Sequence, residues 1–403
     1  MKVALLSSCA RLDDAVGKYT FYLARILAMV SRSKIDVVLG SPIGPQFSAE
    51  KVRVIRFETL PRRGANWIID QRGAKWIIDR LPASVCSSVV FRFRGWGLRS
   101  IKSLAQEISS ADLVWDIFAS SSVVHHIPLE MRGQPLPTFV FDYHGLTSPE
   151  LVDPPQSLWL HESIDELQLC APNADHFVVH SKFMAEELAA RTGFTRNVDV
   201  IRLFCDPELF GSCKMSKRLL GNSFSILFVG RVSKHKGLDV LIRALKIIRD
   251  RGLDVNVTIA GRQAPNDHTT RQINRLAINL GIDEHVSWLG NLTAITLQSA
   301  YSTADLLVLP SRHEGFGLPA IEAMWFGLPV IVSNAGALPE VVKNGALVFE
   351  TDDYEDLADK IIMLHDDLEL RNRTLEAARS VRELYTFEKF SESVREVCEE
   401  YLA

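Results

Sequence analysis

The chain has 403 residues, a length that fits two or three domains of ordinary size. Apolar residues make up 47% and charged residues 23%, which suits a protein with proper hydrophobic cores, and the formal net charge of −4 excludes nucleic acid as an expected partner. Six cysteines are scattered without a CxxC motif or metal-ligand spacing, a pattern typical of reduced thiols in a cytoplasmic protein.

The beginning of the sequence does not resemble a targeting segment. Residues 3–6 form an apolar run that is too short for the core of a signal peptide. No apolar run approaches the ~20 residues that a membrane-spanning helix needs. We therefore expect a cytoplasmic protein, with peripheral binding to the cytoplasmic face of the membrane as an alternative.

The first half of the chain alternates between expected strands and helices, which favours a parallel sheet with helices on both faces. Helical spacing is present over 19–30 and 184–191, and residues 206–222 lack periodicity, as a linker would. The expected strands are 2–6, 37–39, 52–57, 114–119, 138–143, 177–179 and 198–203.

A second series of the same kind follows the linker. Its expected strands are 225–229, 255–260, 286–289, 306–309, 328–332 and 346–349. Its expected helices are 238–248, 270–280, 297–300, a short one from Pro319, 353–365, 368–383 and 387–402.

The predicted fold class is therefore α/β, with two doubly wound, Rossmann-like parallel-sheet domains facing across a cleft. We expect the domains to be 1–205 and 206–386, with the helix over 387–403 crossing back to the first. Ligands in such sheets bind at the carboxyl ends of the strands.

The stretch 306–332 combines a strand, a glycine loop, a short helix and a second strand. Gly315 and Gly317 lie in the loop beside Glu314, and Glu322 is expected in the first helical turn. Backbone N–H groups at such a helix end attract phosphate, and ionised carboxylates accept hydrogen bonds from sugar hydroxyls. The alternatives are a helix-favouring glutamate beside a loop glutamate, and a glycosidase pair, which the spacing disfavours.

A second loop, residues 230–237 (GRVSKHKG), lies between an expected strand and a helix. Gly230 opens it, and Arg231 and Lys236 place a guanidinium and an ammonium near a helix end, which suits a diphosphate. An ordinary polar loop is the alternative. The chain contains no Walker A motif, and residues 315–320 fit the dinucleotide pattern GxGxxA only weakly, because they lie late in their domain and include Pro319.

Two histidines follow strands of the first half and therefore face the predicted cleft. His144 ends the strand over 138–143, and His180 ends the strand over 177–179. Each could bind substrate or act as a base, and each could instead be a structural hydrogen-bonding residue.

Residues 51–102 are strongly basic, with twelve Lys and Arg against three acidic residues, and they include three tryptophans. Within this window, 62–79 is a tandem near-repeat, RRGANWIID and QRGAKWIID. A local duplication in a variable insertion is one interpretation. The other is a basic, aromatic surface that contacts an anionic membrane or acceptor.

Three segments together resemble the GT-B nucleotide-sugar glycosyltransferases, specifically the retaining group called glycosyltransferase family 4. They are residues 229–245 (VGRVSKHKGLDVLIRAL), 285–292 (HVSWLGNL) and 313–342 (HEGFGLPAIEAMWFGLPVIVSNAGALPEVV). The resemblance covers almost the whole chain and is strongest over 224–357. It implies a metal-independent enzyme without a cofactor, and the absence of a DxD triplet agrees.

The resemblance also implies roles for individual residues. Arg231 and Lys236 would bind the donor diphosphate as it leaves, and Glu322 would accept hydrogen bonds from the ribose hydroxyls. Glu314, with the backbone of Gly315, Phe316 and Gly317, would hold the donor sugar and phosphate. Leu318 would contact the nucleoside, and Leu289 and Gly290 would lie near the base. His144 would lie beside the reacting sugar.

One motif departs from the family. Members usually carry a Gly-Gly pair in the first loop, near the donor phosphate, whereas residues 13–18 here read DDAVGK with a single glycine, Gly17. Gly17 is expected to keep the phosphate contact, although acidic neighbours are unusual there.

The resemblance implies transfer of a hexose from a nucleotide diphosphate sugar, with UDP or GDP, to a glycan, lipid-linked or small-molecule acceptor, as in polysaccharide or glycolipid biosynthesis. Retention would involve attack on the face from which the diphosphate leaves. The alternatives are a GT-B epimerase or phosphorylase, a non-catalytic sugar-nucleotide-binding subunit, and an NAD-dependent dehydrogenase that rests on GxGxxA alone.

Overall fold

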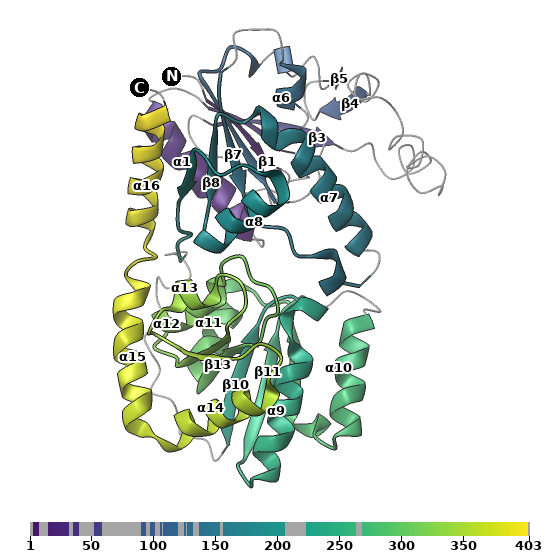
Figure 1. Ribbon diagram of the computed structural model, residues 1–403, viewed down its shortest axis with the longest axis vertical. Helices are drawn as coiled ribbons and strands as arrows, with labels where there is room; N and C mark the ends of the chain where they lie inside the picture. Colours follow the sequence, from purple (N-terminus) through teal and green to yellow (C-terminus); the bar gives the residue numbers. More distant parts are fainter. Residues whose placement is uncertain are drawn as a thin grey trace.

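The computed structural model describes residues 3–7, 15–31, 35–39, 52–58, 90–93, 97–100, 105–106, 108–119, 125, 127–131, 137–153, 156–205, 223–262 and 268–401. The linker over 206–222, the tandem repeat over 62–79 and residues 13–14 lie outside these ranges. Two sheets stand one above the other, each with its own helices (Figure 1).

The first sheet has the strand order β5-β4-β3-β2-β1-β6-β7-β8-β9. All neighbouring pairs from β3 to β9 are parallel, and the hairpin β4–β5 continues the sheet antiparallel from β3, which the sequence analysis did not predict. The strands are β1 (Val3–Ser7), β2 (Ile35–Leu39), β3 (Val52–Glu58), β4 (Val90–Phe93), β5 (Gly97–Ser100), β6 (Leu113–Phe118), β7 (Thr138–Tyr143), β8 (His176–Val179) and β9 (Val198–Val200).

In the described part of this domain, the α-helices are α1 (Ala15–Ser31), α6 (Ile127–Glu130), α7 (Gln156–Cys170) and α8 (Lys182–Thr192). Local chemistry sets the ends of α8. The Ser181 hydroxyl accepts a hydrogen bond from the Met184 N–H at 3.0 Å, and Gly193 ends the helix in the left-handed conformation with φ +79°. Only two residues, His180 and Ser181, separate the end of β8 from the start of α8.

The second sheet is parallel throughout, in the order β12-β11-β10-β13-β14-β15. The order reverses between β10 and β13, as in dinucleotide-binding folds. The strands are β10 (Phe224–Val229), β11 (Val255–Ala260), β12 (Val286–Gly290), β13 (Leu306–Leu309), β14 (Val330–Ser333) and β15 (Leu347–Phe349). The prediction of two parallel-sheet α/β domains is confirmed.

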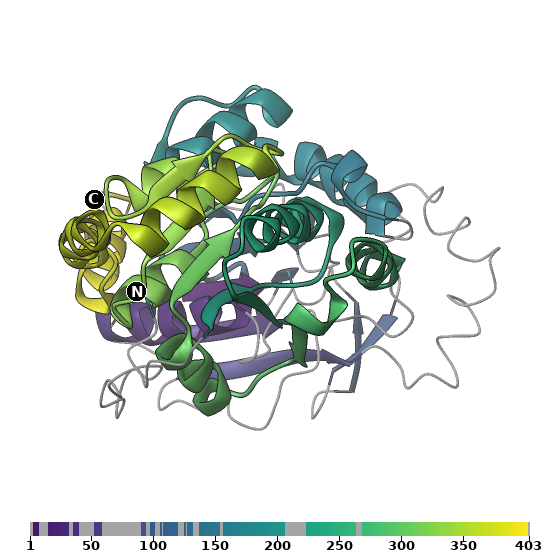
Figure 2. The same ribbon diagram turned by 90° about the horizontal axis from the view of Figure 1, so that it is seen from below.

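Helices cover both faces of this second sheet (Figure 2). β13 shows why its apolar run is continuous: Leu307 packs in the core on one face, and Leu306 and Val308 pack in the core on the other. The helices are α9 (Leu238–Asp250), α10 (His268–Asn279), α11 (Ala294–Thr303), α12 (Leu318–Trp325), α13 (Leu338–Val342), α14 (Tyr354–Asp366) and α15 (Leu368–Arg382).

The last helix, α16 (Phe387–Tyr401), returns to the first domain and lies along α1 (Figure 1). Phe390 and Val394 of α16 are buried in one core with Tyr19 of α1. The Tyr401 ring stacks on His176 with the centroids 3.6 Å apart. The last turns of the chain therefore contribute to the core beneath the first sheet, while the domain limits at 205 and 386 remain predictions.

Two expected positions are corrected by the helix starts. α1 begins at Ala15, so Gly17 lies buried in its first turn and not in the preceding loop. α12 begins at Leu318 after Gly317, whose left-handed conformation (φ +94°) is incompatible with an earlier start. Glu322 is therefore the fifth residue of α12 and belongs to its second turn, not the first.

Two further observations concern the chain as a whole. Among the described helices, none has the length and apolar character that crossing a bilayer requires. Cys170, Cys205 and Cys398 are buried, as the cysteine pattern predicted.

Candidate active site

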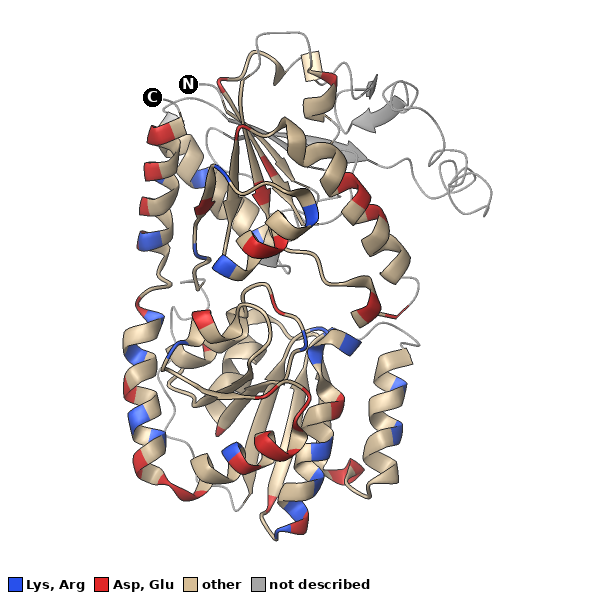
Figure 3. Ribbon diagram, viewed as in Figure 1, with Lys and Arg blue, Asp and Glu red and all other residues tan. Residues whose placement is uncertain are grey.

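Two loops of the second domain meet where its strand order reverses. One follows β10 and contains the short 3-10 helix η5 (Lys234–Lys236), and the other follows β13 and leads into α12. Because the chain leaves these neighbouring strands toward opposite faces of the sheet, the loops leave room for a ligand at this edge. Figure 3 shows basic residues at the edge of this domain that faces the first domain.

Close backbone packing fixes the loops against each other. Gly237 has φ +64°, and a Cβ atom added there would lie 1.8 Å from the Pro310 carbonyl oxygen. Arg312 adds a side-chain clamp: its guanidinium donates to both carboxylate oxygens of Asp239, at 2.9 and 2.7 Å, and to the Lys234 carbonyl at 2.8 Å. The β10 loop therefore cannot shift without breaking a bidentate ion pair.

Lys236 and Glu314 meet at the centre of this edge. Lys236 Nζ lies 2.5 Å from Glu314 Oε2, and each side chain is 16% exposed. The Ser311 hydroxyl donates to the same carboxylate oxygen at 3.2 Å. Lys236 therefore presents an ammonium group whose remaining N–H groups can reach an anion in the cleft.

Neighbouring residues determine the charge of the β10 loop. Burial, followed by the charges of Lys236 and Arg231, lowers the pKa of His235 to about 2, so this imidazole is neutral. Arg231 is exposed, and no ion pair joins it to any residue in the described part of the chain. Positive charge at this site therefore comes from arginine and lysine side chains.

The loop after β13 offers its backbone to the same space. Phe316 is only 4% exposed and packs edge-on against the Tyr385 ring at 5.6 Å, so its side chain anchors the loop. A Cβ atom on Gly317 would lie 2.6 Å from Leu338 Cδ2. The packing of Phe316 on Tyr385 and the close approach of Leu338 to Gly317 hold the loop in place at the start of α12, beside Leu318.

Glu322 is held by a residue that the sequence analysis missed. The Tyr301 hydroxyl donates to Glu322 Oε2 at 2.6 Å from a fully buried position. Burial, followed by the charge of Glu322, raises the pKa of this tyrosine, so it remains a donor. This contact fixes the rotamer of Glu322; the sequence contained no signal for it, because the two residues are joined only by packing of α11 on α12.

Two further predicted donor residues lie at the end of one strand. Leu289 is the penultimate residue of β12 and is 45% exposed, and the carbonyl of Gly290, the last residue of β12, accepts a hydrogen bond from the Gly261 N–H at 2.8 Å. A Cβ atom on Gly261 would lie 1.7 Å from the Gly230 carbonyl oxygen. The backbones after β10, β11 and β12 are therefore tightly stacked along this edge.

The first domain contributes the ends of β7 and β8. These strands pair in parallel with Asp142 opposite Val178 and Tyr143 opposite Val179, so His144 and His180 emerge side by side. Their Nε2 atoms are 3.1 Å apart. Burial, followed by His180, lowers the pKa of His144 to about 3, so this imidazole is neutral.

Three contacts join the two domains beside these groups. The Ser181 hydroxyl, which caps α8, also donates to the Gly315 carbonyl at 2.9 Å. A Cβ atom on Gly315 would lie 2.4 Å from Met184 Cε, so the Met184 side chain packs closely against this glycine. His313 Nε2 lies 3.3 Å from Glu187 Oε1.

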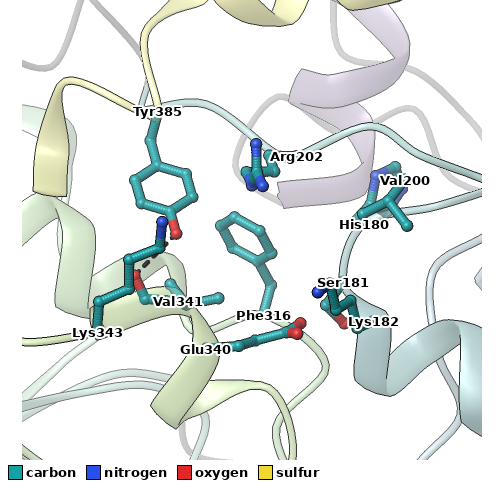
Figure 4. Close-up of a pocket in the computed structure, with 10 residues that line it drawn as sticks. All are labelled: His180, Ser181, Lys182, Val200, Arg202, Phe316, Glu340, Val341, Lys343 and Tyr385. Atoms are coloured by element: carbon teal, nitrogen blue, oxygen red, sulfur yellow. Dashed lines mark hydrogen bonds between the residues drawn. The ribbon is translucent and has the colours of Figure 1, made fainter.

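A cavity of about 320 Å³ is lined by Ser181 of the first domain and by Phe316 of the second (Figure 4). His180 and Phe316 lie on its walls, on opposite domains, and Arg202 and Lys343 add positive charge. The cleft predicted from the two sheets is thus a real space between the domains.

The structure brings most of the predicted residues to one edge of the second sheet. Lys236 and Glu314 are in contact, the glycine loop follows, and His144 lies across the domain contact. Gly17 lies in the first turn of α1, whose preceding residues are outside the described ranges. The residues that sequence reasoning missed are Asp142, Ser181, Met184, Tyr301 and Arg312, which act through partners distant in sequence.

Part of the chain is similar to a known protein family. Residues 214–381 match the family described as Glycosyl transferases group 1. A D-inositol 3-phosphate glycosyltransferase of Corynebacterium aurimucosum is 32% identical over 167 residues, which is 39% of this chain and 40% of that protein. The chain thus matches about two fifths of this relative's length.

Solved structures share the whole architecture. A sucrose-phosphate synthase from Thermosynechococcus elongatus superposes with a TM-score of 0.72 and 19% identity, covering 99% of this chain and 98% of that one. Anabaena HepE in complex with UDP-glucose gives 0.69 and 17%, covering 99% and 100%. The chain therefore has the GT-B fold of two facing α/β domains, and its residues 214–381 match the glycosyl transferases group 1 family.

Proposed function

We propose that this protein is a retaining glycosyltransferase that moves a hexose from a nucleotide diphosphate sugar to a hydroxyl group of an acceptor. The observation that carries the proposal is the contact between Lys236 and Glu314 at the point where the strand order of the second sheet reverses. A cation that can bind a phosphate and a carboxylate that can bind sugar hydroxyls lie together here. Residues 214–381, which include both, match a family of glycosyl transferases.

Charged side chains of the β10 loop take the role of a metal ion at the donor diphosphate. Lys236 turns its remaining N–H groups to the phosphate oxygens while it keeps its contact with Glu314, and the exposed guanidinium of Arg231 adds a planar fork. Charge that develops on the leaving diphosphate is then stabilised by fixed groups. Arg312 acts as a positioning residue, because it holds the loop through Asp239 and the Lys234 carbonyl.

Donor recognition uses the edge from β12 to α12. Glu322, fixed by Tyr301, accepts hydrogen bonds from the ribose hydroxyls, and Leu318 with the end of β12 contacts the nucleoside. Glu314 and the backbone of Gly315 hold the sugar. The presence of UDP-glucose in the HepE complex supports a nucleoside diphosphate of the UDP or GDP type.

Retention follows from attack on the face that the diphosphate leaves. The bond from the anomeric carbon to the phosphate oxygen breaks, the acceptor oxygen forms the new bond to that carbon, and the acceptor proton goes to the departing phosphate oxygen. His144 lies beside the reacting sugar, where its neutral imidazole contributes a hydrogen bond rather than a charge.

The acceptor is a glycan, a lipid-linked sugar or a small molecule that enters from the first domain. The basic window over 51–102 would hold the protein at an anionic membrane surface if the acceptor is lipid-linked. A peripheral position on the cytoplasmic face is part of this proposal.

The test begins with thermal unfolding of the full chain against a panel of nucleoside diphosphates and nucleotide sugars. A ligand at 100 times its Kd stabilises by about 2.7 kcal/mol, so a bound donor raises the Tm measurably. Slow hydrolysis of that donor without acceptor, in a chelator and with the anomeric configuration of the released sugar read by NMR, supports a retaining transferase. A sugar nucleotide that binds but is never cleaved identifies a non-catalytic binding subunit, and nicotinamide binding alone would overturn the proposal.

A further inference from the structure

Three potential metal ligands converge where β7 and β8 end. His180 Nε2 lies 3.1 Å from His144 Nε2 and 3.1 Å from Asp142 Oδ1, and His144 Nε2 lies 3.5 Å from the same carboxylate oxygen. The side chains of Asp142 and His180 are completely buried, and that of His144 is 7% exposed. Such a cluster must hold either shared protons or a cation.

The second ring nitrogen of His180 limits where its protons can be. His180 Nδ1 lies 2.8 Å from the Ile201 carbonyl oxygen, which can only accept, so Nδ1 carries a proton. In a neutral imidazole, Nε2 then has a lone pair that points toward His144 and Asp142. A ligating histidine in proteins typically has this arrangement, with its other N–H donated to a backbone carbonyl.

The carboxylate of Asp142 is unevenly satisfied. Its Oδ2 accepts hydrogen bonds from the Tyr19 hydroxyl at 2.7 Å and from Trp115 Nε1 at 2.8 Å. Its Oδ1 is buried and has no hydrogen bond of acceptable geometry in the described structure, although both imidazoles are near it. A buried oxygen in this state calls for a partner, and it faces the two imidazole nitrogens.

We propose that Asp142, His144 and His180 form a binding site for a divalent transition-metal ion of the Zn²⁺ class. Imidazole nitrogen and carboxylate oxygen bind such ions at about 2.0–2.2 Å. The three ligand atoms form a triangle whose corners lie about 1.9 Å from its centre, from the separations above, so an ion slightly out of their plane reaches all three. A fourth position remains open.

Access to the site comes from the space between the domains. His180 lines the cavity of about 320 Å³, and His144 is the ligand that is partly exposed (Figure 4 shows His180 at the wall). The ring centroids of the two histidines are 4.2 Å apart, and the ring planes are tilted by 55° to each other. The site would thus open toward the cleft and exclude bulk water from its other sides.

Occupation of the site has a consequence for catalysis, and only this consequence rests on the proposed function. A metal ion would engage His144 Nε2 and remove it from the reacting sugar, so Zn²⁺ would inhibit transfer. The proposed metal site lies on the first domain. It is therefore separate from the proposed diphosphate site, which lies on the second domain with Lys236.

The test is titration of the chelator-treated full chain with Co²⁺, in the absence of donor and acceptor. The result expected is one Co²⁺ per chain with the intense visible absorption of a four-coordinate ion, displaced by an equivalent of Zn²⁺. His144→Ala and His180→Gln should each weaken binding by more than about 100-fold, and Tyr19→Phe, which removes a partner of Asp142, by about 10-fold. His161→Gln on the exposed face of α7 is the matched control and should bind like the unmodified chain.

Absence of stoichiometric binding, or binding that survives both His144→Ala and His180→Gln, would overturn the site in favour of a shared proton or adventitious surface binding. Because His180 is buried, circular dichroism checks that its variant is folded; if it is not, the partly exposed His144 variant decides the question. These measurements need no transfer activity, so a failed metal site and a failed glycosyltransferase assignment are distinguishable.

Discussion

Replacement of Lys236 by alanine removes the cation at the proposed diphosphate site with little change elsewhere. Among the described residues, the Lys236 ammonium forms an ion pair with Glu314, at 2.5 Å. Once it is absent, the leaving diphosphate loses a fixed donor, and Glu314 keeps only the Ser311 hydroxyl. The substitution therefore separates a catalytic role from a structural one.

Two magnitudes distinguish these roles. Loss of a preorganised donor to transition-state charge typically costs about 10²–10³ in kcat, or about 2.7–4 kcal/mol. Loss of a partly exposed ion pair costs about 1 kcal/mol of folding stability, which lowers Tm by roughly 2–4 °C for a domain of this size. We expect the Lys236→Ala variant to stay folded and to lose most of its donor turnover.

The assay measures release of the nucleoside diphosphate from the donor identified by thermal unfolding. Lys234→Ala is the matched control, because it removes the same charge two residues away from an exposed side chain whose Nζ is 3.4 Å from the Glu150 carbonyl. Its turnover should stay within about threefold of the unmodified chain. Equal activity of the two variants would refute the placement of the donor diphosphate at Lys236.

Three other predictions concern folding and membrane binding. Gly237→Ala should destabilise the second domain by more than about 2 kcal/mol in urea unfolding, because its Cβ would meet the Pro310 carbonyl in a left-handed backbone, whereas Gly252→Ala (φ +90°, nothing within 4 Å) should cost only about 1 kcal/mol. Similar losses in both would show that the loop contact is unimportant. Burial opposes ionisation of Glu187, but hydrogen bonds and charge from His313 and Arg191 lower its pKa below the usual 4.5, so the stability it adds is present above pH 4.5 and lost as pH falls through the lowered pKa. The difference in unfolding free energy between the unmodified chain and Glu187→Gln should therefore shrink from pH 7 to pH 3. A difference that stays constant would contradict a stabilising role for the ionised Glu187 carboxylate. Pelleting with anionic liposomes should be strong at low salt and weak at high salt, and charge reversal within 62–80 should abolish it; unchanged pelleting argues against a membrane role for this segment.

Much of the fold was predictable from local patterns. The apolar run over 306–309 is long enough only for a buried strand, and the structure places β13 at those residues with Leu307 facing one core and its neighbours the other. The βαβ order, the start of α9 after Gly237 and the helical spacing of α1 were likewise readable. The first residues of the helices were harder to predict. α1 begins four residues before the expected helix, so Gly17 lies in its first turn.

The residues of the second domain that we propose for donor binding could be found because they cluster in short motifs. Arg231 and Lys236 are five residues apart, and the glycine loop runs directly into α12. Their partners were not predictable, because Arg312 with Asp239 and Tyr301 with Glu322 are separated by many residues and meet only through packing.

By itself, the sequence determined the two α/β domains, the glycine loops and the charged residues after β10 and β13, because hydrophobic periodicity and turn chemistry are local. Only the tertiary structure decided which of these residues meet. Parallel pairing of β7 with β8 brings His144 and His180 within 3.1 Å and aims both at Asp142. The close approach of Met184 to Gly315 places that group opposite the loop after β13. Such contacts depend on strand register and on how two domains dock, and these are set by the burial of the whole chain, not by the residues of one motif.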